Sequence, residues 1–111
     1  MLARRRTLGG VEVLELLGKI TIADGEGELH RMVQDLLDAG RTRILISLER
    51  VGFMDSGGLG ELIACYKRAA ERGGTIKLLR PTGKVADLLS LSKMTEILEV
   101  FKDEGEAIAS F

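Results

Sequence analysis

The segment Met54-Asp55-Ser56-Gly57-Gly58-Leu59-Gly60 contains the residue types in this chain that are best suited to chemistry. The hydroxyl of Ser56 could accept a phosphate or act as a nucleophile. An aspartate or serine directly before a helix is also an ordinary N-cap, whose side-chain oxygen accepts a hydrogen bond from an amide of the first helical turn. Both Asp55 and Ser56 are suited to that capping role.

The glycines that follow Ser56 need an explanation of their own. Gly57, Gly58 and Gly60 fall in the first turns of a predicted helix, where each glycine costs about 1 kcal/mol relative to alanine. We therefore expect small size to be needed there, so that another macromolecule can approach the backbone closely. The positive partial charge of a helix N-terminus would also favour a phosphate on Ser56.

Three enzyme motifs that could contain this segment do not fit it. A hydrolase nucleophile elbow requires glycine two residues before the serine, where this chain has Met54. A phosphate-binding P-loop requires a lysine before its final Ser or Thr, and that lysine is missing. The spacing of Gly57-Gly58-Leu59-Gly60 also differs from the dinucleotide-binding fingerprint.

The remaining candidates for catalysis or metal binding are His30 and Cys65. His30 falls in a predicted helix with no evident route to Ser56, and we expect it to be partly exposed. Cys65 lies among apolar residues at helical spacing, so we expect it in the core. A single cysteine excludes an internal disulfide and a cysteine-cluster metal site. The sequence therefore predicts no catalytic residues, no metal and no cofactor.

The elements that would position Ser56 follow from hydrophobic periodicity and turn residues. A hairpin is predicted from residues 2–8 with Gly9-Gly10 as its turn. The other predicted strands are 12–22, 43–48, 75–79 and 97–101, and the predicted helices are 29–40, 58–72, 84–91 after Pro81, and 103–111. Strands that alternate with helices predict an α/β fold with a mixed, mainly parallel sheet, an edge hairpin strand and about four helices.

Length and composition limit the class of protein. We expect the 111 residues to form one domain with an ordinary hydrophobic fraction of 45%. No apolar run reaches the roughly 20 residues that span a bilayer, so we expect a soluble protein without membrane insertion. The 16 basic residues nearly balance the 17 acidic ones, which disfavours direct binding of nucleic acid. The single cysteine suits a cytoplasmic location.

The run Met54-Asp55-Ser56-Gly57-Gly58-Leu59-Gly60-Glu61-Leu62 resembles the Asp-Ser-Ser/Thr-Gly-Leu-Gly signature of the STAS-domain anti-sigma-factor antagonists. Two further stretches are similar to that family, Gly18-Lys19-Ile20-Thr21 after its second strand and Gly73-Gly74-Thr75-Ile76-Lys77-Leu78-Leu79 at its penultimate strand. The likeness extends from about residue 12 to 111. The resemblance implies a single STAS domain over residues 1–111.

The resemblance also implies a function. In that family the serine directly after the aspartate is phosphorylated, and it corresponds to Ser56. The unphosphorylated domain would bind an anti-sigma factor that is also a serine kinase and so free a sigma factor. Phosphorylation would end the binding, and a phosphatase would reset Ser56. Magnesium and ATP would belong to the kinase. The implied partner-binding residues are Asp55, Ser56, Gly57, Gly58, Leu59, Gly60 and Thr21.

This chain departs from the family pattern at two of these positions. Gly57 stands where the family usually has Ser or Thr, which removes a second hydroxyl beside the phosphorylation site. Thr21 stands where many members carry an acidic residue that engages the partner. The choice of partner is therefore not fixed by the resemblance.

Two other functions share the predicted fold. One is a non-phosphorylated STAS scaffold subunit of a signalling assembly or a transporter complex; the intact Asp55-Ser56 pair favours the antagonist but is also compatible with this scaffold. The other is a small-ligand or nucleotide sensor that uses a helix N-terminus as an anion site. The antagonist function further requires Ser56 to be exposed at the start of the second helix. That helix is predicted to turn Leu59, Leu62, Ile63 and Tyr66 to the sheet and to leave Glu61, Lys67, Arg68, Glu71 and Arg72 more solvated.

Overall fold

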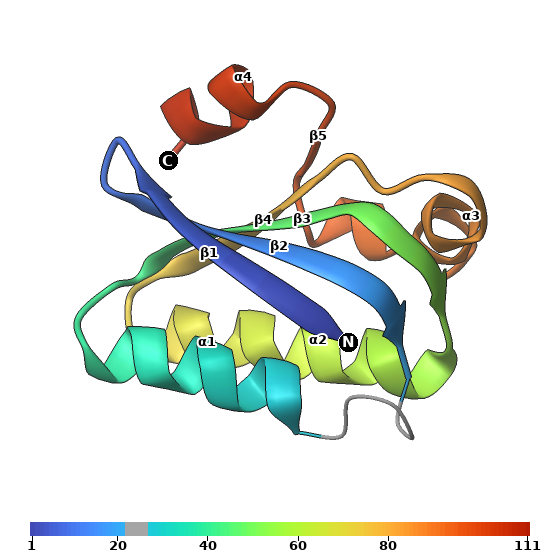
Figure 1. Ribbon diagram of the computed structural model, residues 1–111, viewed down its shortest axis with the longest axis horizontal. Helices are drawn as coiled ribbons and strands as arrows, with labels where there is room; N and C mark the ends of the chain where they lie inside the picture. The colour runs from blue at the N-terminus through green and yellow to red at the C-terminus, as the bar shows by residue number, and fades with distance from the viewer. Residues whose placement is uncertain (22–26) are drawn as a thin grey trace.

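A computed structural model describes residues 1–21 and 27–111, and it shows one sheet between two layers of helices (Figure 1). The five strands lie in the order β1-β2-β3-β4-β5. The first pair is antiparallel and the other three pairs are parallel. This confirms the predicted α/β class with a mainly parallel sheet and an edge hairpin.

The edge hairpin consists of β1 (Leu2–Leu8) and β2 (Val11–Ile20). Gly9 and Gly10 connect the strands with φ angles of 55° and 76°. Two successive positive φ angles define a type I′ turn, whose twist matches that of the flanking strands. The hairpin predicted from the glycine pair is therefore confirmed. Residue 22, the predicted end of the second strand, lies outside the described residues.

The central and far strands are β3 (Arg43–Met54), β4 (Thr75–Leu79) and β5 (Val100–Phe101). The bounds of β4 match the prediction, whereas β3 extends six residues beyond the predicted end at residue 48. The predicted last strand over 97–101 is too long, because a short 3₁₀ helix, η1 (Met94–Glu96), precedes it and the amide of Leu98 donates to the carbonyl of Met94.

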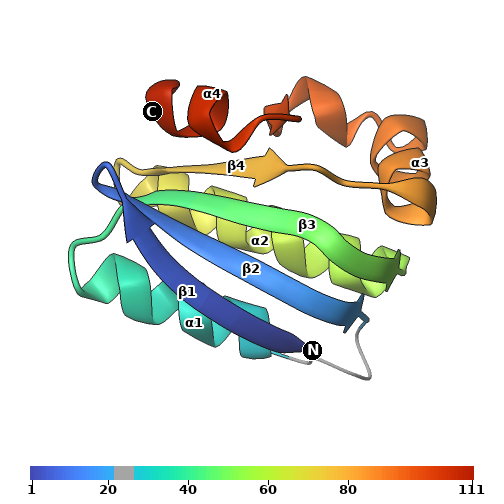
Figure 2. The same cartoon turned by 45° about the horizontal axis from the view of Figure 1, so that its top comes forward.

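The helices are α1 (Glu28–Asp38), α2 (Ser56–Glu71), α3 (Gly83–Leu91) and α4 (Glu104–Ala109). Figures 1 and 2 show α1 and α2 side by side on one face of the sheet and α4 on the other. Helix α3 lies near the carboxyl end of β3. Among the described residues no helix is long and apolar enough to cross a membrane.

The sheet is covered by hydrophobic contacts on both faces. The larger cluster joins β2, β3 and β4 to α1 and α2, and it includes Leu14, Ile46, Leu37 and Leu62. The smaller cluster joins the other face of the strands to α4 through Ala107. Apolar residues on both sides explain why residues 44–46 of β3 form an uninterrupted buried run.

Helix α2 presents nearly the predicted face to the sheet. Leu59 and Leu62 are buried, while Ile63 and Tyr66 are half-buried against the core. The buried stripe continues through Cys65 and Ala69, so the face is slightly rotated from the prediction. Of the charged residues predicted to be solvated, four are exposed: Lys67, Arg68, Glu71 and Arg72. Glu61 is half-buried, and its Oε1 accepts a hydrogen bond of 3.1 Å from the His30 amide of α1.

Candidate functional site

The candidate site lies where β3 passes directly into α2. Strand β3 ends at Met54 and the helix begins at Ser56, so Asp55 alone connects them. Its backbone is extended, with φ −99° and ψ −179°. The sequence predicts a longer connection, because the apolar run of the strand stops before its backbone pairing does. The short connection fixes the direction of the first helical turn relative to the sheet.

Asp55 is the N-cap of α2. Its Oδ1 accepts a hydrogen bond of 2.7 Å from the Gly58 amide, and its carbonyl accepts the amide of Leu59 at 2.9 Å. The sequence allowed either Asp55 or Ser56 to cap the helix, and the structure assigns the cap to Asp55. Ser56 is therefore the first helical residue, and its hydroxyl is not used for capping.

Ser56 is exposed, which confirms the predicted position of its side chain at the accessible start of the helix. Gly57 is half-buried and Gly60 is exposed. A Cβ added at Gly60 would meet no atom within 4 Å, so the surface there is open. The accessible part of the segment is therefore made of Ser56, Gly57 and Gly60, with the half-buried Asp55 beside them.

Gly58 has a different role from the one expected from the sequence. It is buried, and an added Cβ would lie 1.9 Å from the carbonyl oxygen of Ile20 at the end of β2. The Asp55 amide also donates to this carbonyl, at 3.4 Å. The small size of Gly58 therefore lets the first turn of α2 pack against β2, and Leu59, 7% exposed, anchors the same turn in the core.

Thr21 follows Ile20 directly, so the close contact between Ile20 and α2 places it beside the site. Its residue surface is only 7% exposed. The structure therefore brings Thr21 close to Asp55 in the fold but gives it little surface of its own.

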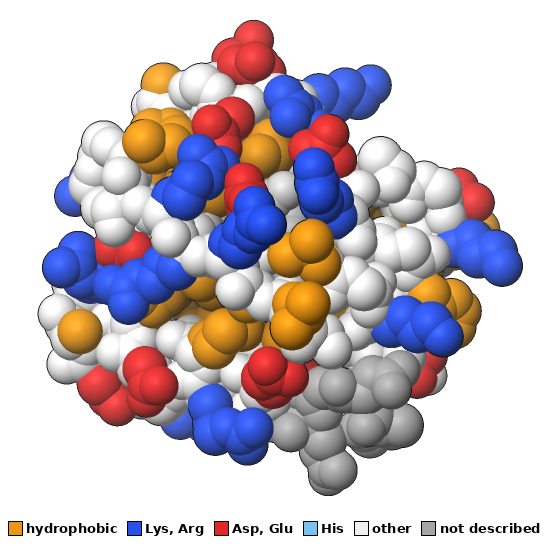
Figure 3. Space-filling view, in the orientation of Figure 1, with side chains coloured by type: hydrophobic (Ala, Val, Ile, Leu, Met, Phe, Trp, Pro, Cys, Tyr) orange, Lys and Arg blue, Asp and Glu red, His pale blue; other side chains and the backbone are white. Residues whose placement is uncertain are grey.

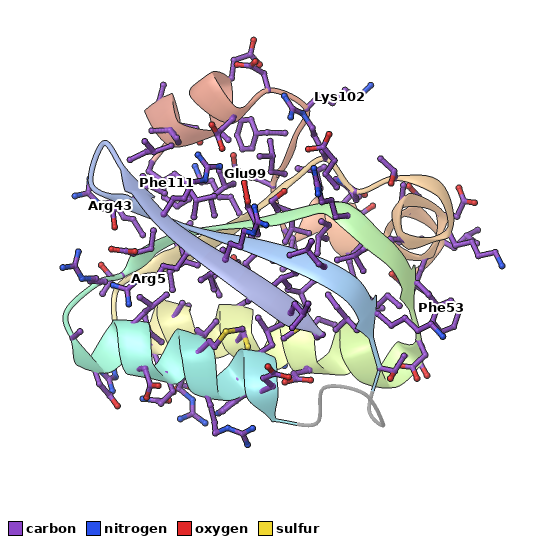
Figure 4. The ribbon with its side chains drawn as sticks, in the orientation of Figure 1. Arg5, Arg43, Phe53, Glu99, Lys102 and Phe111 are labelled. Atoms are coloured by element: carbon purple, nitrogen blue, oxygen red, sulfur yellow. The ribbon has the colours of Figure 1, made fainter. Side chains whose placement is uncertain are left out.

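Phe53 is an exposed aromatic residue beside the site that no sequence motif indicates. Its surface is 40% exposed, and Figure 4 shows its ring projecting outward near the start of α2. Met54, the next residue, is buried. Alternation along a strand turns neighbouring side chains to opposite faces. A prediction that extended β3 to Met54 would therefore have identified Phe53 as outward-facing.

The start of α2 combines the positive end of a helix with one nearby carboxylate. No acidic residue occupies the first turn of this 16-residue helix, and a helix N-terminus has a positive partial charge of roughly half an elementary charge. The neighbouring Asp55 carboxylate is engaged by the Gly58 amide. A phosphate on Ser56 would therefore lie at the positive end of a helix and next to one fixed negative charge.

The other side chains that could carry chemistry are Cys65 and His30. Cys65 is in the core, as predicted, with 0% exposure. Burial, with the nearby Glu61 carboxylate, raises the pKa of its thiol to about 12, which disfavours the reactive thiolate. His30 is half-buried in α1, in line with the sequence prediction. Within residues 1–21 and 27–111, no three His, Cys, Asp or Glu side chains gather closely enough to hold a metal ion.

The chain is a small α/β domain with a mainly parallel sheet, an antiparallel edge hairpin and an exposed serine directly after the aspartate that caps a helix. The chain belongs to the STAS domain family, because the family profile described as "Mlab, STAS domain" matches residues 3–99. It is also similar to an anti-sigma F factor antagonist of Paenibacillus polymyxa, at 26% identity over 99 residues that cover 89% of this chain and 85% of the relative.

Two solved structures have the same fold. The Bacillus cell-fate determinant SpoIIAA in its phosphorylated form matches with a TM-score of 0.74 and 22% identity, covering 98% of both chains. A sulfate transporter family protein of Wolinella succinogenes matches with a TM-score of 0.72 and 20% identity, covering 95% of this chain and 87% of that protein. At these identities the likeness concerns the fold alone.

Proposed function

We propose that this chain is an anti-sigma-factor antagonist that binds an anti-sigma factor with serine kinase activity, and that phosphorylation of Ser56 ends the binding. The observation that carries the proposal is the exposed Ser56 at the first position of α2, directly after its Asp55 cap. The name of the Paenibacillus polymyxa relative supports the kind of partner.

The unphosphorylated surface is suited to a close protein contact. Ser56, Gly57 and Gly60 expose backbone and a small hydroxyl, and Phe53 adds an aromatic ring at the edge. Aromatic residues are frequent anchors of protein interfaces. A partner could therefore approach the helix start closely and cover Phe53.

Phosphorylation would change this surface by bulk and charge. A phosphate brings about −1.5 to −2 charges and three acceptor oxygens. The Asp55 carboxylate accepts a hydrogen bond of 2.7 Å from the Gly58 amide, and this bond holds the carboxylate beside Ser56. In the complex, the phosphate and the Asp55 carboxylate would lie together in a contact from which water is excluded. The repulsion and the lost hydration of the two anions would weaken the complex and release the partner. A phosphatase would restore the binding form.

The whole chain would act as one domain in this role. Helix α4 lies beyond the residues matched by the family profile, yet Ala107 is fully buried against Val11, Val13 and Leu45 of the sheet. We therefore assign residues 1–111 to a single STAS domain. In the proposed role the chain is a cytoplasmic binding module rather than an enzyme, and the kinase supplies magnesium and ATP.

The proposal is tested by phosphorylation with the kinase-type anti-sigma factor recovered by pull-down from the native cell. With Mg-ATP, the wild-type chain should take up one phosphate and Ser56→Ala should take up none, as measured by mass spectrometry of the intact protein. Ser90→Ala, at an exposed serine of α3, is the matched control and should be modified like the wild type. Uptake by Ser56→Ala would contradict the assignment of the site.

The alternative function is a STAS scaffold subunit that is not switched by phosphate. The shared fold of the Wolinella succinogenes sulfate transporter family protein favours keeping this candidate. A scaffold would bind its partner equally well when Ser56 is modified. Pull-down of transporter or signalling subunits in place of an anti-sigma factor would support it.

A further inference from the structure

The outer edge of β1 is a free edge of the sheet. β1 is the first strand in the order β1-β2-β3-β4-β5, and within the described residues it pairs with β2 alone. The strand is seven residues long. A free strand edge presents backbone N–H and C=O groups that can pair with another extended chain.

The turn geometry shows which residues direct their backbone groups outward. A type I′ turn over Gly9 and Gly10 makes Leu8 and Val11 a hydrogen-bonded pair. Hydrogen-bonded and non-hydrogen-bonded pairs alternate along an antiparallel ladder. Thr7, Arg5 and Ala3 therefore point their backbone groups away from β2.

A groove runs between this edge and helix α1, with a volume of about 170 Å³. The β1 groove is lined by Ala3, Arg4, Arg5, Leu14, Met32, Asp35 and Leu36. Its apolar floor is made of the buried Leu14 and Leu36 and the half-buried Met32. A dry cavity of about 150 Å³ can hold benzene, so the groove has room for one leucine- or phenylalanine-sized side chain.

The free edge of β1 and the groove share residues. Ala3 and Arg5 line the groove, and they are also residues whose backbone groups point outward. Side chains of a strand alternate between the two faces of a sheet. An extended segment paired with β1 would therefore place every second side chain over the groove, which is how strand addition combines main-chain affinity with side-chain specificity.

The residues of β1 itself are basic, because it contains Arg4, Arg5 and Arg6 and no acidic residue. Arg6 is paired with Glu15 and Glu104. Arg5 and Arg41 both contact the buried Glu12 carboxylate, at 3.0 and 2.8 Å, so two cations surround one anion. Arg4 is exposed and has no ion pair among the described residues. Asp35 of α1 contributes an anion on the other side of the groove. Figure 3 shows basic side chains over β1 beside exposed hydrophobic ones, and Figure 4 shows Arg5 on the side of β1 that faces α1.

The same charges disfavour a second copy of this chain as the occupant. Antiparallel pairing of two β1 strands over their full length is centred on Arg5, so it would set Arg5 against Arg5 and Arg4 against Arg6. Like charges directly opposite each other destabilise a pair of strands. An acidic partner segment would be attracted to the same arginines.

We propose that the β1 edge binds an extended acidic segment of a partner protein by strand addition, with one apolar side chain of that segment in the β1 groove. This inference does not depend on the proposed function, because it uses none of the residues at the start of α2. It gives the domain a second interaction surface that phosphorylation of Ser56 would leave in place.

The probe is a fluorescein-labelled, acetylated peptide of sequence Glu-Asp-Glu-Leu-Glu-Asp-Glu, titrated against the full chain by fluorescence anisotropy. The expected result is saturable binding, with amide shifts in NMR spectra concentrated at Ala3, Arg5 and Thr7. A peptide with lysine at every acidic position should not bind. An acidic peptide methylated on alternate backbone nitrogens should also lose binding, because it cannot donate to the strand.

Variants of the edge separate pairing from charge. Ala3→Pro removes a backbone N–H that points outward, and proline is tolerated in edge strands. The substitution should lower the affinity for the acidic peptide about fivefold. Ala3→Ser keeps the N–H and should bind like the wild type. Arg4→Glu should weaken binding by about tenfold, whereas Lys84→Glu, the same reversal at an exposed residue of α3, should leave it unchanged.

Three results would overturn the proposal. They are the absence of saturable binding by the acidic peptide, equal binding of the acidic and lysine peptides, and amide shifts that gather elsewhere than on β1. Far-UV circular dichroism of Ala3→Pro checks that the variant is folded. The methylated peptide tests strand pairing on the wild-type chain, so the proposal can fail even if that variant does not fold.

Discussion

At the scale of single residues, the start of α2 depends on the absence of a side chain at Gly58. A methyl group there would lie 1.9 Å from the Ile20 carbonyl oxygen and must move the helix or the strand. We expect Gly58→Ala to lower the free energy of unfolding by about 1–3 kcal/mol, the range for overpacking. Urea denaturation followed by circular dichroism measures the change.

The matched control is Gly60→Ala, two residues along the same helix. An added Cβ at Gly60 meets no atom within 4 Å, and alanine is favoured over glycine inside a helix by roughly 0.5–1 kcal/mol. Gly60→Ala should therefore be neutral or stabilising. Equal losses in the two variants would show that the contact with Ile20 is not what requires glycine at position 58.

The cap and the proposed phosphorylation site are adjacent residues that can be separated by mutation. Asp55→Ala removes the acceptor of the 2.7 Å bond from the Gly58 amide and should cost roughly 0.5–2 kcal/mol. Ser56→Ala should change the free energy of unfolding by no more than about 0.5 kcal/mol. Thermal and urea unfolding of both variants measures the difference. A larger loss in Ser56→Ala than in Asp55→Ala would mean that the cap is wrongly assigned.

At this scale the sequence predicts that residues 54–60 form the site, but it does not predict the role of each residue. Asp55 and Ser56 are both good capping residues, so only the backbone path shows which one precedes the helix. The role of Gly58 depends on Ile20, 38 positions earlier in the chain. A local pattern contains no information about that contact.

At the scale of elements, the edge hairpin is held by the buried carboxylate of Glu12. Burial alone would raise the pKa of Glu12, but hydrogen bonds from Arg5 and Thr7 and the charges of Arg5 and Arg41 outweigh it, so that the pKa lies below its ordinary value of 4.5. A carboxyl whose pKa is lowered by folding stabilises the folded state above its unfolded pKa. That contribution is present above about pH 4.5 and is lost as the pH falls through the folded value.

Glu12→Gln should therefore lose stability at pH 7 and differ less from the wild type as the solution is acidified below pH 4.5. Urea unfolding at pH 7 and at lower pH values measures the difference in free energy of unfolding between the variant and the wild type. Glu71→Gln, at an exposed residue of α2, is the control and should differ from the wild type by no more than about 0.5 kcal/mol at pH 7. A gap between Glu12→Gln and the wild type that stays constant with pH would contradict the account.

The elements also show where hydrophobic pattern stops predicting structure. The apolar run of β3 ends at Leu48, but the strand continues to Met54 with Val51 and Met54 buried and Glu49 and Arg50 exposed. The hydrophobic pattern changes after Leu48 because the second half of the strand is no longer buried on both faces, and not because the strand ends. At β5 the reverse occurs, since apolar residues before Val100 belong to the turn after η1 rather than to the ladder.

At the scale of the whole molecule, the sheet brings the end of β2 and the β3–α2 junction together. Parallel pairing of Ile20 with Met54 places Thr21 beside Asp55 although they are distant in sequence. The sequence motif predicts Ser56 and its neighbours, but the exposure of Phe53 follows only from the length of β3. The charged edge of β1 forms a separate surface on the same sheet.

The central claim is that the surface around Ser56 binds a kinase-type anti-sigma factor and that a phosphate abolishes the contact. The most direct test is isothermal titration calorimetry of that partner against the unmodified chain and the chain phosphorylated at Ser56. Ser56→Ala should bind like the unmodified chain, and Ser56→Asp should bind more weakly than it, because one carboxylate has less charge and bulk than a phosphate. We expect strong binding of the unmodified chain and loss of binding on phosphorylation. Equal affinity for the two forms would contradict this claim and favour the scaffold function.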